Sequence, residues 1–305
     1  MDLKQLFYRT IYEKNINFLL RNFNFRLSFL LPSKIKIPPS GVFKLKTDSG
    51  TIKFQTNQTS YLTQLLFWNG YKEFEYSEIF EKLVKKTNTF LDIGANIGYY
   101  SLLATISNPT IKIYAFEPAC GPKYYLKKNI LLNGFQNNIN FQGLALSETI
   151  GTIEFYEVKS EKYNYLQYNL SGENNAGTKT VSRNFLKIEV ESMTLSAFIE
   201  NENITSIELI KIDTEGTEVE ILKSGKNYIE KFMPIIICET LFHTTENLLT
   251  DFFSKMDYEF YNHTEKGLKK VDTITRTKDN GIRNCFFVPI KKRHLISEFI
   301  DKKEN

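Results

Sequence analysis

The sequence contains few of the residues that build metal centres or disulfide frameworks. Among its 305 residues there are only three cysteines and three histidines. Cys120, Cys238 and Cys285 are odd in number and widely spaced, and no C-x-x-C pair occurs, so neither a disulfide framework nor a zinc site is expected. This cysteine usage favours a reducing, cytoplasmic compartment.

Long apolar runs are missing as well. The most apolar stretch, residues 16–32 (INFLLRNFNFRLSFLLP), is interrupted by Arg21 and Arg26, and it falls short of the roughly 20 apolar residues that a membrane span requires. A signal peptide is not expected either, because an uninterrupted apolar segment and a small-residue cleavage site are both lacking. Two interpretations stay open: an amphipathic helix packed on the main domain, or a basic, aromatic surface helix that rests on anionic lipid or binds an acidic glycolipid.

The formal net charge is only +4, but it is unevenly distributed. Residues 1–46 contain nine Lys or Arg and two Asp or Glu, a net +7, so the remaining residues carry −3. This basic N-terminal arm favours peripheral contact with the anionic inner face of a membrane. No nucleic-acid partner is expected.

With 42% hydrophobic residues, the chain can bury a full core. Residues 42–56 alternate about Asp48-Ser49-Gly50, which predicts a β-hairpin, and helices are predicted near residues 59–68 and 74–86. From Thr89 onward, short apolar runs alternate with helical segments, which indicates βαβ units around a sheet buried on both faces. These runs are TFLDIG, IKIYAFEP, INFQGLAL, IELIKID and MPIIICET.

The last two strand-like runs, DYEFYNHT and RNCFFVPIKK, have no helix-length segment between them. We therefore expect them to pair antiparallel at one edge of the sheet. The chain divides accordingly into a basic arm with the hairpin (residues 1–59), a main domain (residues 60–292) and a charged C-terminal tail (residues 293–305).

The stretch FLDIGANIGYYS (residues 90–101) is typical of the turn from a first parallel strand into a helix. Gly94 and Gly98 allow the backbone to approach a ligand closely and to adopt conformations that a Cβ would forbid. A dinucleotide site would have G-x-G-x-x-G, whereas Asn96 stands at the middle position here and Asp92 ends the strand. A carboxylate at that place would repel a pyrophosphate and suits a cationic ligand that carries an amino group and a sulfonium.

A second acid, Glu117, ends the next predicted strand, 25 residues after Asp92. An acid at this position accepts hydrogen bonds from the hydroxyls of an unphosphorylated ribose in dinucleotide-binding folds. Two acids at neighbouring strand ends, on either side of a glycine turn, predict a site for S-adenosylmethionine.

Four blocks resemble the FkbM family of S-adenosylmethionine-dependent methyltransferases: FLDIGANIGYYSLLA, FEPACGPKYYLKKNILLNG, LALSETIGTIEF and LIKIDTEGTEVEILKSG. The resemblance covers residues 60–290 and rests chiefly on D-x-G-x-N-x-G combined with KIDTEGTEVEIL. It implies an α/β, Rossmann-like, seven-stranded sheet, mostly parallel with one antiparallel strand and helices on both faces, here with an N-terminal α/β extension. It also implies methyl transfer, usually to a hydroxyl oxygen. The cofactor contacts expected from these blocks are Asp92, Gly94, Ala95, Asn96, Gly98, Glu117, Pro118, Leu146 and Asp213.

Methyl transfer to a hydroxyl requires an acceptor oxygen held in line with the methyl carbon, and a base for its proton. Asp213 ends the fourth predicted strand, and Glu215, two residues on, points the same way in extended backbone. Glu239 ends the fifth strand, and His243, a residue type that titrates near neutral pH, follows four residues later. These four residues are the catalytic candidates. No metal is expected, because Asp213 and Glu239 have no third ligand at a recognisable spacing.

The favoured acceptor is a sugar hydroxyl of a surface polysaccharide or of its lipid-linked precursor. The basic arm suits an anionic carrier, and the Tyr-rich insert at residues 156–170 would stack on a sugar ring, unless it forms an edge hairpin with half-buried tyrosines. O-methylation of a polyketide or another small-molecule hydroxyl is the alternative. Two possibilities of another class stay open: an NAD-dependent dehydrogenase, which the missing G-x-G-x-x-G disfavours, and a non-catalytic module that keeps the cofactor fold.

Overall fold

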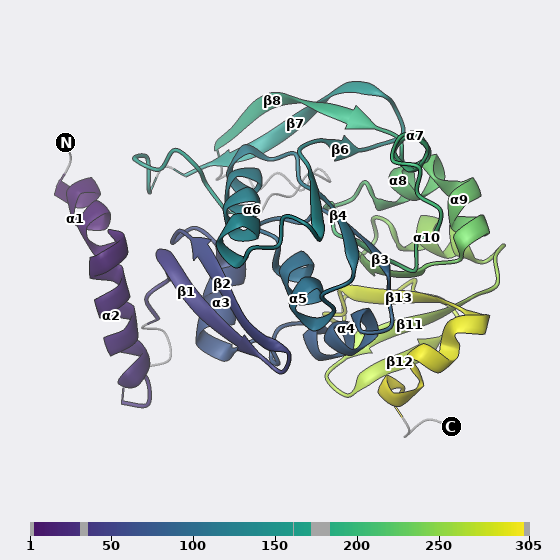
Figure 1. The fold of residues 1–305 in the computed structure, drawn as a ribbon, viewed down its shortest axis with the longest axis horizontal. Coiled ribbons are helices and arrows are strands. Elements are labelled where there is room, and N and C mark those ends of the chain that lie inside the picture. The colour runs from purple at the N-terminus through teal and green to yellow at the C-terminus, as the bar shows by residue number, and fades with distance from the viewer. Residues whose placement is uncertain (1–2, 31–35, 161, 172–183, 302–305) are drawn as a thin grey trace.

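A large mixed sheet lies at the centre of the molecule (Figure 1). The computed structural model describes residues 3–30, 36–160, 162–171 and 184–301. Eight strands of this sheet fall within them: β3 (Thr89–Ile93), β4 (Lys112–Phe116), β5 (Ile139–Gln142), β9 (Leu209–Ile212), β10 (Ile235–Glu239), β11 (Tyr258–Thr264), β12 (Gly267–Val271) and β13 (Asn284–Pro289). Their order is β12-β11-β13-β10-β9-β3-β4-β5.

The five strands from β5 to β10 are parallel, while β13 runs against both of its neighbours and β12 runs against β11. The central strands β3, β9 and β10 are almost continuously buried and mostly apolar, as expected where helices cover both faces of a sheet. One face packs on α3 (Tyr61–Asn69), α4 (Ser77–Val84), α5 (Tyr99–Ser107) and α6 (Cys120–Asn133), and the other on α7 (Leu195–Asn201), α8 (Glu218–Ser224), α9 (Lys226–Phe232) and α10 (Glu246–Phe253).

The direction in which the chain adds strands reverses between β3 and β9. From β3 the chain passes through α5 to β4 and through α6 to β5, whereas β9 pairs with the opposite side of β3. In open α/β sheets, ligands bind beyond the carboxyl ends of the strands at this switch point. The turn of Gly94 and the strand end of Asp213 meet there.

The mostly parallel α/β fold predicted from the sequence is confirmed, with three corrections of detail. The sheet has eight strands rather than seven, because a tight turn before Gly267 folds β12 back onto β11. The two last predicted strands do pair antiparallel, but β13 lies between β10 and β11, so β12 is the edge strand. The predicted third strand is divided between β5 and β6 (Ala145–Leu146), and β6 belongs to another sheet.

That smaller sheet has the order β6-β8-β7. Its strands β7 (Gly151–Lys159) and β8 (Asn184–Met193) pair antiparallel over their whole length, and β6 pairs parallel with the end of β8. In Figure 1 this sheet lies beyond α6 and β4 at the top of the molecule. It therefore adds a wall next to the switch point.

The predicted N-terminal hairpin is confirmed as β1 (Gly41–Thr47) and β2 (Gly50–Thr56). Its backbone is tied to α6, because the N–H groups of Lys53 and Gln55 donate to the side chains of Asn133 (2.8 Å) and Asn129 (2.7 Å). The inward side chains of the hairpin join the same apolar cluster as β3 and β4. The domain boundary at residue 59 stays a prediction.

Two helices precede the hairpin, α1 (Leu3–Ile11) and α2 (Lys14–Arg26), and they follow one another along one end of the molecule (Figure 1). After β13 come two 3-10 helices, η1 (Ile290–Leu295) and η2 (Ser297–Phe299), while residues 302–305 of the predicted tail lie outside the described residues. In the described part of the chain, no helix combines the length and the apolar character needed to cross a membrane.

Candidate active site

The turn after β3 is shaped by close contact between two strand ends. Gly94 has a φ of +74°, and a Cβ at this residue would lie 1.9 Å from the carbonyl oxygen of Asp213. Asn96 has a φ of +52°, and Gly98, the N-cap residue just before α5, has a φ of +90°. Three left-handed residues in five explain why glycine and asparagine recur here.

We expect Gly94→Ala to destabilise the fold strongly, because the added methyl group would collide with backbone atoms. Gly134→Ala is the matched control: Gly134 has the same φ of +74°, but nothing lies within 4 Å of its Cβ position. In the control, the free energy of unfolding should fall only by the roughly 1–2 kcal/mol that a left-handed backbone conformation costs an alanine. Urea unfolding measures both variants, and similar losses would contradict the close contact between β3 and β9.

A cavity of about 430 Å³ opens beyond the ends of β3, β4 and β9. Six of the nine predicted cofactor residues line it: Gly94, Asn96, Glu117, Pro118, Leu146 and Asp213. The other three, Asp92, Ala95 and Gly98, are buried and do not line the cavity. The structure therefore brings most of the predicted cofactor-binding residues together at one cavity. The three buried residues support the turn between β3 and α5.

Glu117 is held at the cavity by the backbone. Its two carboxylate oxygens accept hydrogen bonds from the N–H groups of Asn96 (2.8 Å) and Ala119 (2.9 Å). Burial raises the pKa of Glu117 to about 7, against the opposing effect of these two bonds. A carboxylate offers roughly four acceptor positions, so two remain for ligand hydroxyls.

The lining of this cavity is acidic. Among the residues that the structure describes, it includes six carboxylates and no Lys, Arg or His. Such a surface favours a cation and repels a pyrophosphate. The residues present thus fit the sulfonium and amino groups of S-adenosylmethionine, and they do not fit a dinucleotide. The six acids are Glu117, Glu148, Glu154, Asp213, Glu215 and Glu220.

The carboxylate of Asp92 is buried and makes its contacts inside the protein, not in the cavity. One oxygen accepts hydrogen bonds from the N–H (3.1 Å) and Oγ (2.6 Å) of Ser101, and the other lies 3.7 Å from Nζ of Lys211. Lys211, within β9, also donates to the carbonyl of Gly94 (2.8 Å) and lies 3.4 Å from Asp213. Lys211 is not among the residues predicted from the sequence, although a lysine within the apolar run LIKI signals a buried ion pair.

Three carboxylates converge where β9 and β10 end. Asp213, Glu215 and Glu239 each have an oxygen within 4.8 Å of the others. Glu215 has a φ of +59°, so it reaches this carboxylate cluster from a left-handed turn and not from the extended backbone that we predicted. The turn is braced by the buried Glu218, whose carboxylate accepts from the N–H of Gly216 (2.9 Å).

Burial and the nearby negative charges favour the protonated forms of two members of the cluster, Glu215 and Glu239. Burial, followed by the charge of Asp213, raises the pKa of Glu239 to about 9 and that of Glu215 to about 7. At neutral pH Glu239 therefore carries a proton, in a hydrogen bond with Asp213. Three such carboxylates have the geometry to hold a divalent cation, and Glu215 is the third ligand that the sequence did not lead us to expect. The ammonium of Lys211 lies between Asp213 (3.4 Å) and Asp92 (3.7 Å), and we assign no metal.

We expect Glu239→Gln, which resembles the protonated carboxyl, to stabilise the fold at alkaline pH. The pKa of Glu239 in the folded state, about 9, lies above its ordinary value of 4.5, so the wild type loses stability as the pH rises between these values. The melting-temperature advantage of the variant should therefore grow between about pH 6 and about pH 9.

Melting should be recorded with EDTA, since a bound cation would hold the carboxylates ionised. Glu220→Gln, a cavity acid outside the carboxylate cluster, should follow the pH dependence of the wild type. An advantage of Glu239→Gln that does not change with pH would argue against a protonated Glu239.

Glu75 is a further acid near the carboxylate cluster that the sequence did not reveal. It lies just before α4, accepts a hydrogen bond from the hydroxyl of Tyr100 (2.6 Å), and has a φ of +44°. Its charge also contributes to the raised pKa of Glu239. No motif includes Glu75, because only tertiary packing brings α4 and α5 to the end of β10.

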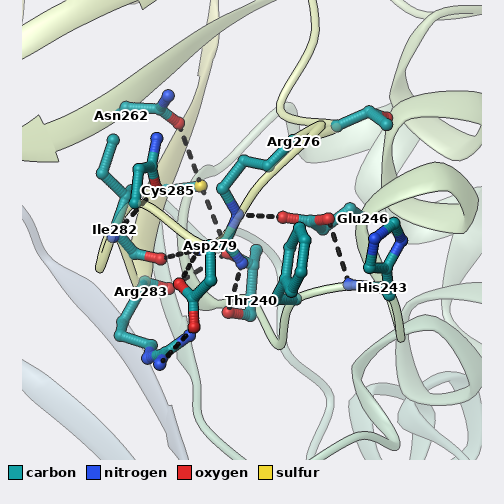
Figure 2. Close-up of polar contacts among 12 residues, drawn as sticks. Thr240, His243, Glu246, Asn262, Arg276, Asp279, Ile282, Arg283 and Cys285 are labelled. Carbon is teal, nitrogen blue, oxygen red and sulfur yellow. Dashed lines mark hydrogen bonds and ion pairs between the residues drawn. The ribbon is translucent and has the colours of Figure 1, made fainter.

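The segment after β10 is fixed by a buried ion pair (Figure 2). Arg276 binds Glu246 and donates to the carbonyl of Thr240 (3.2 Å), and Glu246 accepts from the backbone N–H of His243 (3.3 Å). The imidazole of His243 is exposed and contacts the ring of Phe242. His243 does not belong to the carboxylate cluster, so its role as a base stays a prediction.

The Tyr-rich insert packs against the N-terminal arm and α6. The ring of Tyr163 makes edge contacts with Tyr8 (5.3 Å between centroids) and Tyr12 (5.6 Å), and Tyr168 stacks on Tyr124 (4.0 Å). The aromatic residues that line the cavity are Phe116 of β4 and Phe155 and Tyr156 of β7, so the first residue of the insert, Tyr156, does reach the cavity. Tyr163 therefore anchors the arm and Tyr168 packs on α6, while Tyr156 faces the cavity.

An open α/β sheet with an acidic cavity at its switch point fits the fold of S-adenosylmethionine-dependent methyltransferases. Comparison with known families agrees: residues 92–265, more than half of the chain, match the methyltransferase FkbM domain. The chain belongs to the FkbM methyltransferase family.

Relatives with a stated role share part of the chain. Methyltransferase sdnD of Sordaria araneosa is 29% identical over 192 residues, which cover 56% of this chain and 73% of the relative. The 31-O-demethyl-FK506 methyltransferase FkbM of Streptomyces tacrolimicus is 25% identical over 177 residues, covering 50% and 68%. The solved methyltransferase FkbM of Methylobacillus flagellatus has 17% identity and a TM-score of 0.43, with 66% of this chain and 43% of that chain covered.

Proposed function

We propose that the protein transfers a methyl group from S-adenosylmethionine to a hydroxyl oxygen. This proposal rests chiefly on one observation: the acidic cavity is bordered both by Glu117 and by the carboxylate cluster. Recognition of a cation thus lies next to groups that exchange protons near neutral pH. Membership of a methyltransferase family and the acidic lining both speak against the NAD-dependent alternative, and the cluster speaks against a non-catalytic module.

The chain's own residues have distinct tasks in this proposal. S-adenosylmethionine supplies, when bound, a methyl group activated by its sulfonium. Glu117 would accept hydrogen bonds from the ribose hydroxyls. Glu215, with a pKa of about 7, suits a general base, which works best near the operating pH. Asp213 would orient the acceptor hydroxyl. The proton on Glu239 would hold the carboxylate of Asp213 in place, and the ammonium of Lys211 would compensate the negative charge of Asp213.

For the acceptor we propose a sugar hydroxyl of a surface polysaccharide or of its lipid-linked precursor. The formal net charge of +7 on residues 1–46 supports an acceptor that is attached to an anionic or membrane-borne carrier. Of the Tyr-rich insert only Tyr156 lines the cavity and adds support, since Tyr163 packs on the arm and Tyr168 on α6. The name of the Streptomyces tacrolimicus relative, a 31-O-demethyl-FK506 methyltransferase, favours the alternative of a small-molecule hydroxyl, and also favours oxygen as the methylated atom.

We expect calorimetry on the full chain to show binding of S-adenosylhomocysteine and none of NAD. Glu117→Ala should weaken this binding by roughly 1.5–3 kcal/mol for each lost hydrogen bond to the carboxylate. Glu148→Ala removes an exposed acid of the same lining and should change the affinity little. Undiminished binding by a folded Glu117→Ala variant would remove the ribose assignment, and tight binding of NAD would overturn the proposed cofactor.

A further inference from the structure

The two N-terminal helices expose an unusual amount of apolar surface. Of the eighteen large hydrophobic residues exposed in the described part of the chain, eleven lie between residues 3 and 30. Single exposed apolar residues are common on soluble proteins, whereas a contiguous concentration marks an interaction surface. The eleven are Leu3, Leu6, Phe7, Ile16, Phe18, Leu19, Leu20, Phe23, Phe25, Phe29 and Leu30.

Hydrogen bonds fix the orientation of α2 with its polar side inward. Its buried residues are Asn17, Arg21 and Asn24. The guanidinium of Arg21 donates to the carbonyls of Ser40 (2.8 Å) and Val42 (2.5 Å), and Oδ1 of Asn17 accepts from the N–H of Ser40 (2.7 Å). Turning the apolar side of α2 inward would leave these buried polar groups unpaired, which is costly. The outward apolar side therefore belongs to the folded state.

The outward residues form one face. Ile16, Leu19 and Phe23 are spaced three and four residues apart, so they share the side of α2 opposite its buried residues; Leu19 is 68% exposed and Phe23 65%. Leu3 and Phe7 of α1 are four residues apart and also exposed. α1 and α2 follow one another along the same end of the molecule (Figure 1), and we call the exposed apolar residues Leu3, Phe7, Ile16, Leu19 and Phe23 of these two helices the docking face.

Basic side chains accompany this docking face. Arg9, Lys14 and Arg26 are exposed on the same two helices. The acid within residues 3–30 is Glu13, and its carboxylate caps the start of α2. A second copy of the chain would set like charges against each other, and an uncharged apolar partner would leave them without a role. An anionic lipid surface accommodates both the charges and the apolar side chains.

We propose that the docking face binds an anionic phospholipid membrane surface. α1 and α2 would lie in the plane of the interface, with Leu3, Phe7, Leu19 and Phe23 at the boundary between headgroups and acyl chains. The basic residues would lie among the headgroup phosphates. This proposal is independent of the methyl acceptor, although it would bring the cavity close to acceptors carried by the membrane.

Vesicle flotation of the full-length chain tests the proposal. Binding is expected with vesicles of phosphatidylcholine and phosphatidylglycerol, much less with phosphatidylcholine alone, and it should fall as salt shortens the screening length. Leu19→Ser combined with Phe23→Ser should abolish it. Leu131→Ser combined with Leu186→Ser, which removes two apolar side chains of similar exposure elsewhere (62% and 53%), should bind like the wild type.

Two double variants that each remove two basic residues test the electrostatic contribution to vesicle binding. Arg9→Gln with Arg26→Gln should weaken partitioning about 25-fold at low salt, whereas Lys255→Gln with Lys266→Gln, exposed lysines far from the arm in sequence, should not. Circular dichroism checks that each variant is folded. The proposal fails if the wild type ignores anionic vesicles at low salt, if both charge pairs act alike, or if light scattering shows a dimer that the Leu19 and Phe23 changes dissociate while vesicle binding is absent.

Discussion

Asp213→Asn should lower turnover by about 10²–10⁴-fold, the usual contribution of acid–base catalysis, because the base Glu215 needs the acceptor hydroxyl that Asp213 orients, while the fold should remain. Asp213 is the member of the carboxylate cluster that both lines the cavity and contacts Lys211. An amide keeps the shape of the side chain but loses the charge on which the cluster depends. Turnover can be followed as S-adenosylhomocysteine released with an extract of the source cells as acceptor.

Glu220→Gln is the matched control for this experiment, because Glu220 lines the same cavity but lies outside the carboxylate cluster. It should keep most of the turnover. Glu215→Gln should lower turnover and flatten its rise with pH near neutrality, since the pKa of Glu215 is about 7. If Asp213→Asn loses its thermal transition together with activity, Asp213 is a structural residue.

Lys211→Met should cost about 3–5 kcal/mol of unfolding free energy, as expected when one partner of a buried ion pair is removed. Asp92 is fully buried, and the oxygen that faces Lys211 has no hydrogen-bond partner among the described residues. Without the ammonium, that carboxylate would remain charged and buried or would have to take up a proton. Chemical denaturation at neutral pH measures the loss.

Two variants make this prediction specific. Lys223→Met removes an exposed lysine and should change stability little. Asp92→Asn combined with Lys211→Met removes both charges and should recover a large part of the loss, because no unpaired charge stays buried. If the double variant is as unstable as the sum of the single changes, the ion pair is not what stabilises the meeting of β3 and β9.

The parts of the site that the sequence could predict are local. Gly94 is a glycine because of its backbone conformation and its neighbour, and Glu117 and Asp213 are placed by the ends of their own strands. Apolar runs bounded by turns therefore located β3, β4, β9 and β10 and the residues that follow them. The same pattern could not divide β5 from β6, since one continuous run serves two sheets.

What the sequence could not predict depends on contacts between distant segments. Glu75 lies near the carboxylate cluster only because α4 packs beside α5. Lys211 becomes a partner of Asp92 only once β9 pairs with β3. The arm shows the same limit most clearly. The pattern of residues 16–26 is amphipathic, but hydrogen bonds from Arg21 to the carbonyls of Ser40 and Val42, at the start of β1, decide that its polar side is buried.

Mass spectrometry of the source cells tests the central claim most directly. Glycans, lipids and small molecules would be compared between cells that produce the wild type, the Asp213→Asn variant or no protein, each grown on methionine with a deuterated methyl group. We predict one class of molecule that carries a deuterated methyl ether only in the presence of the wild type. Identical methyl ethers in all three cultures, or a protein-dependent methyl group on nitrogen or carbon, would contradict S-adenosylmethionine-dependent O-methylation by this chain.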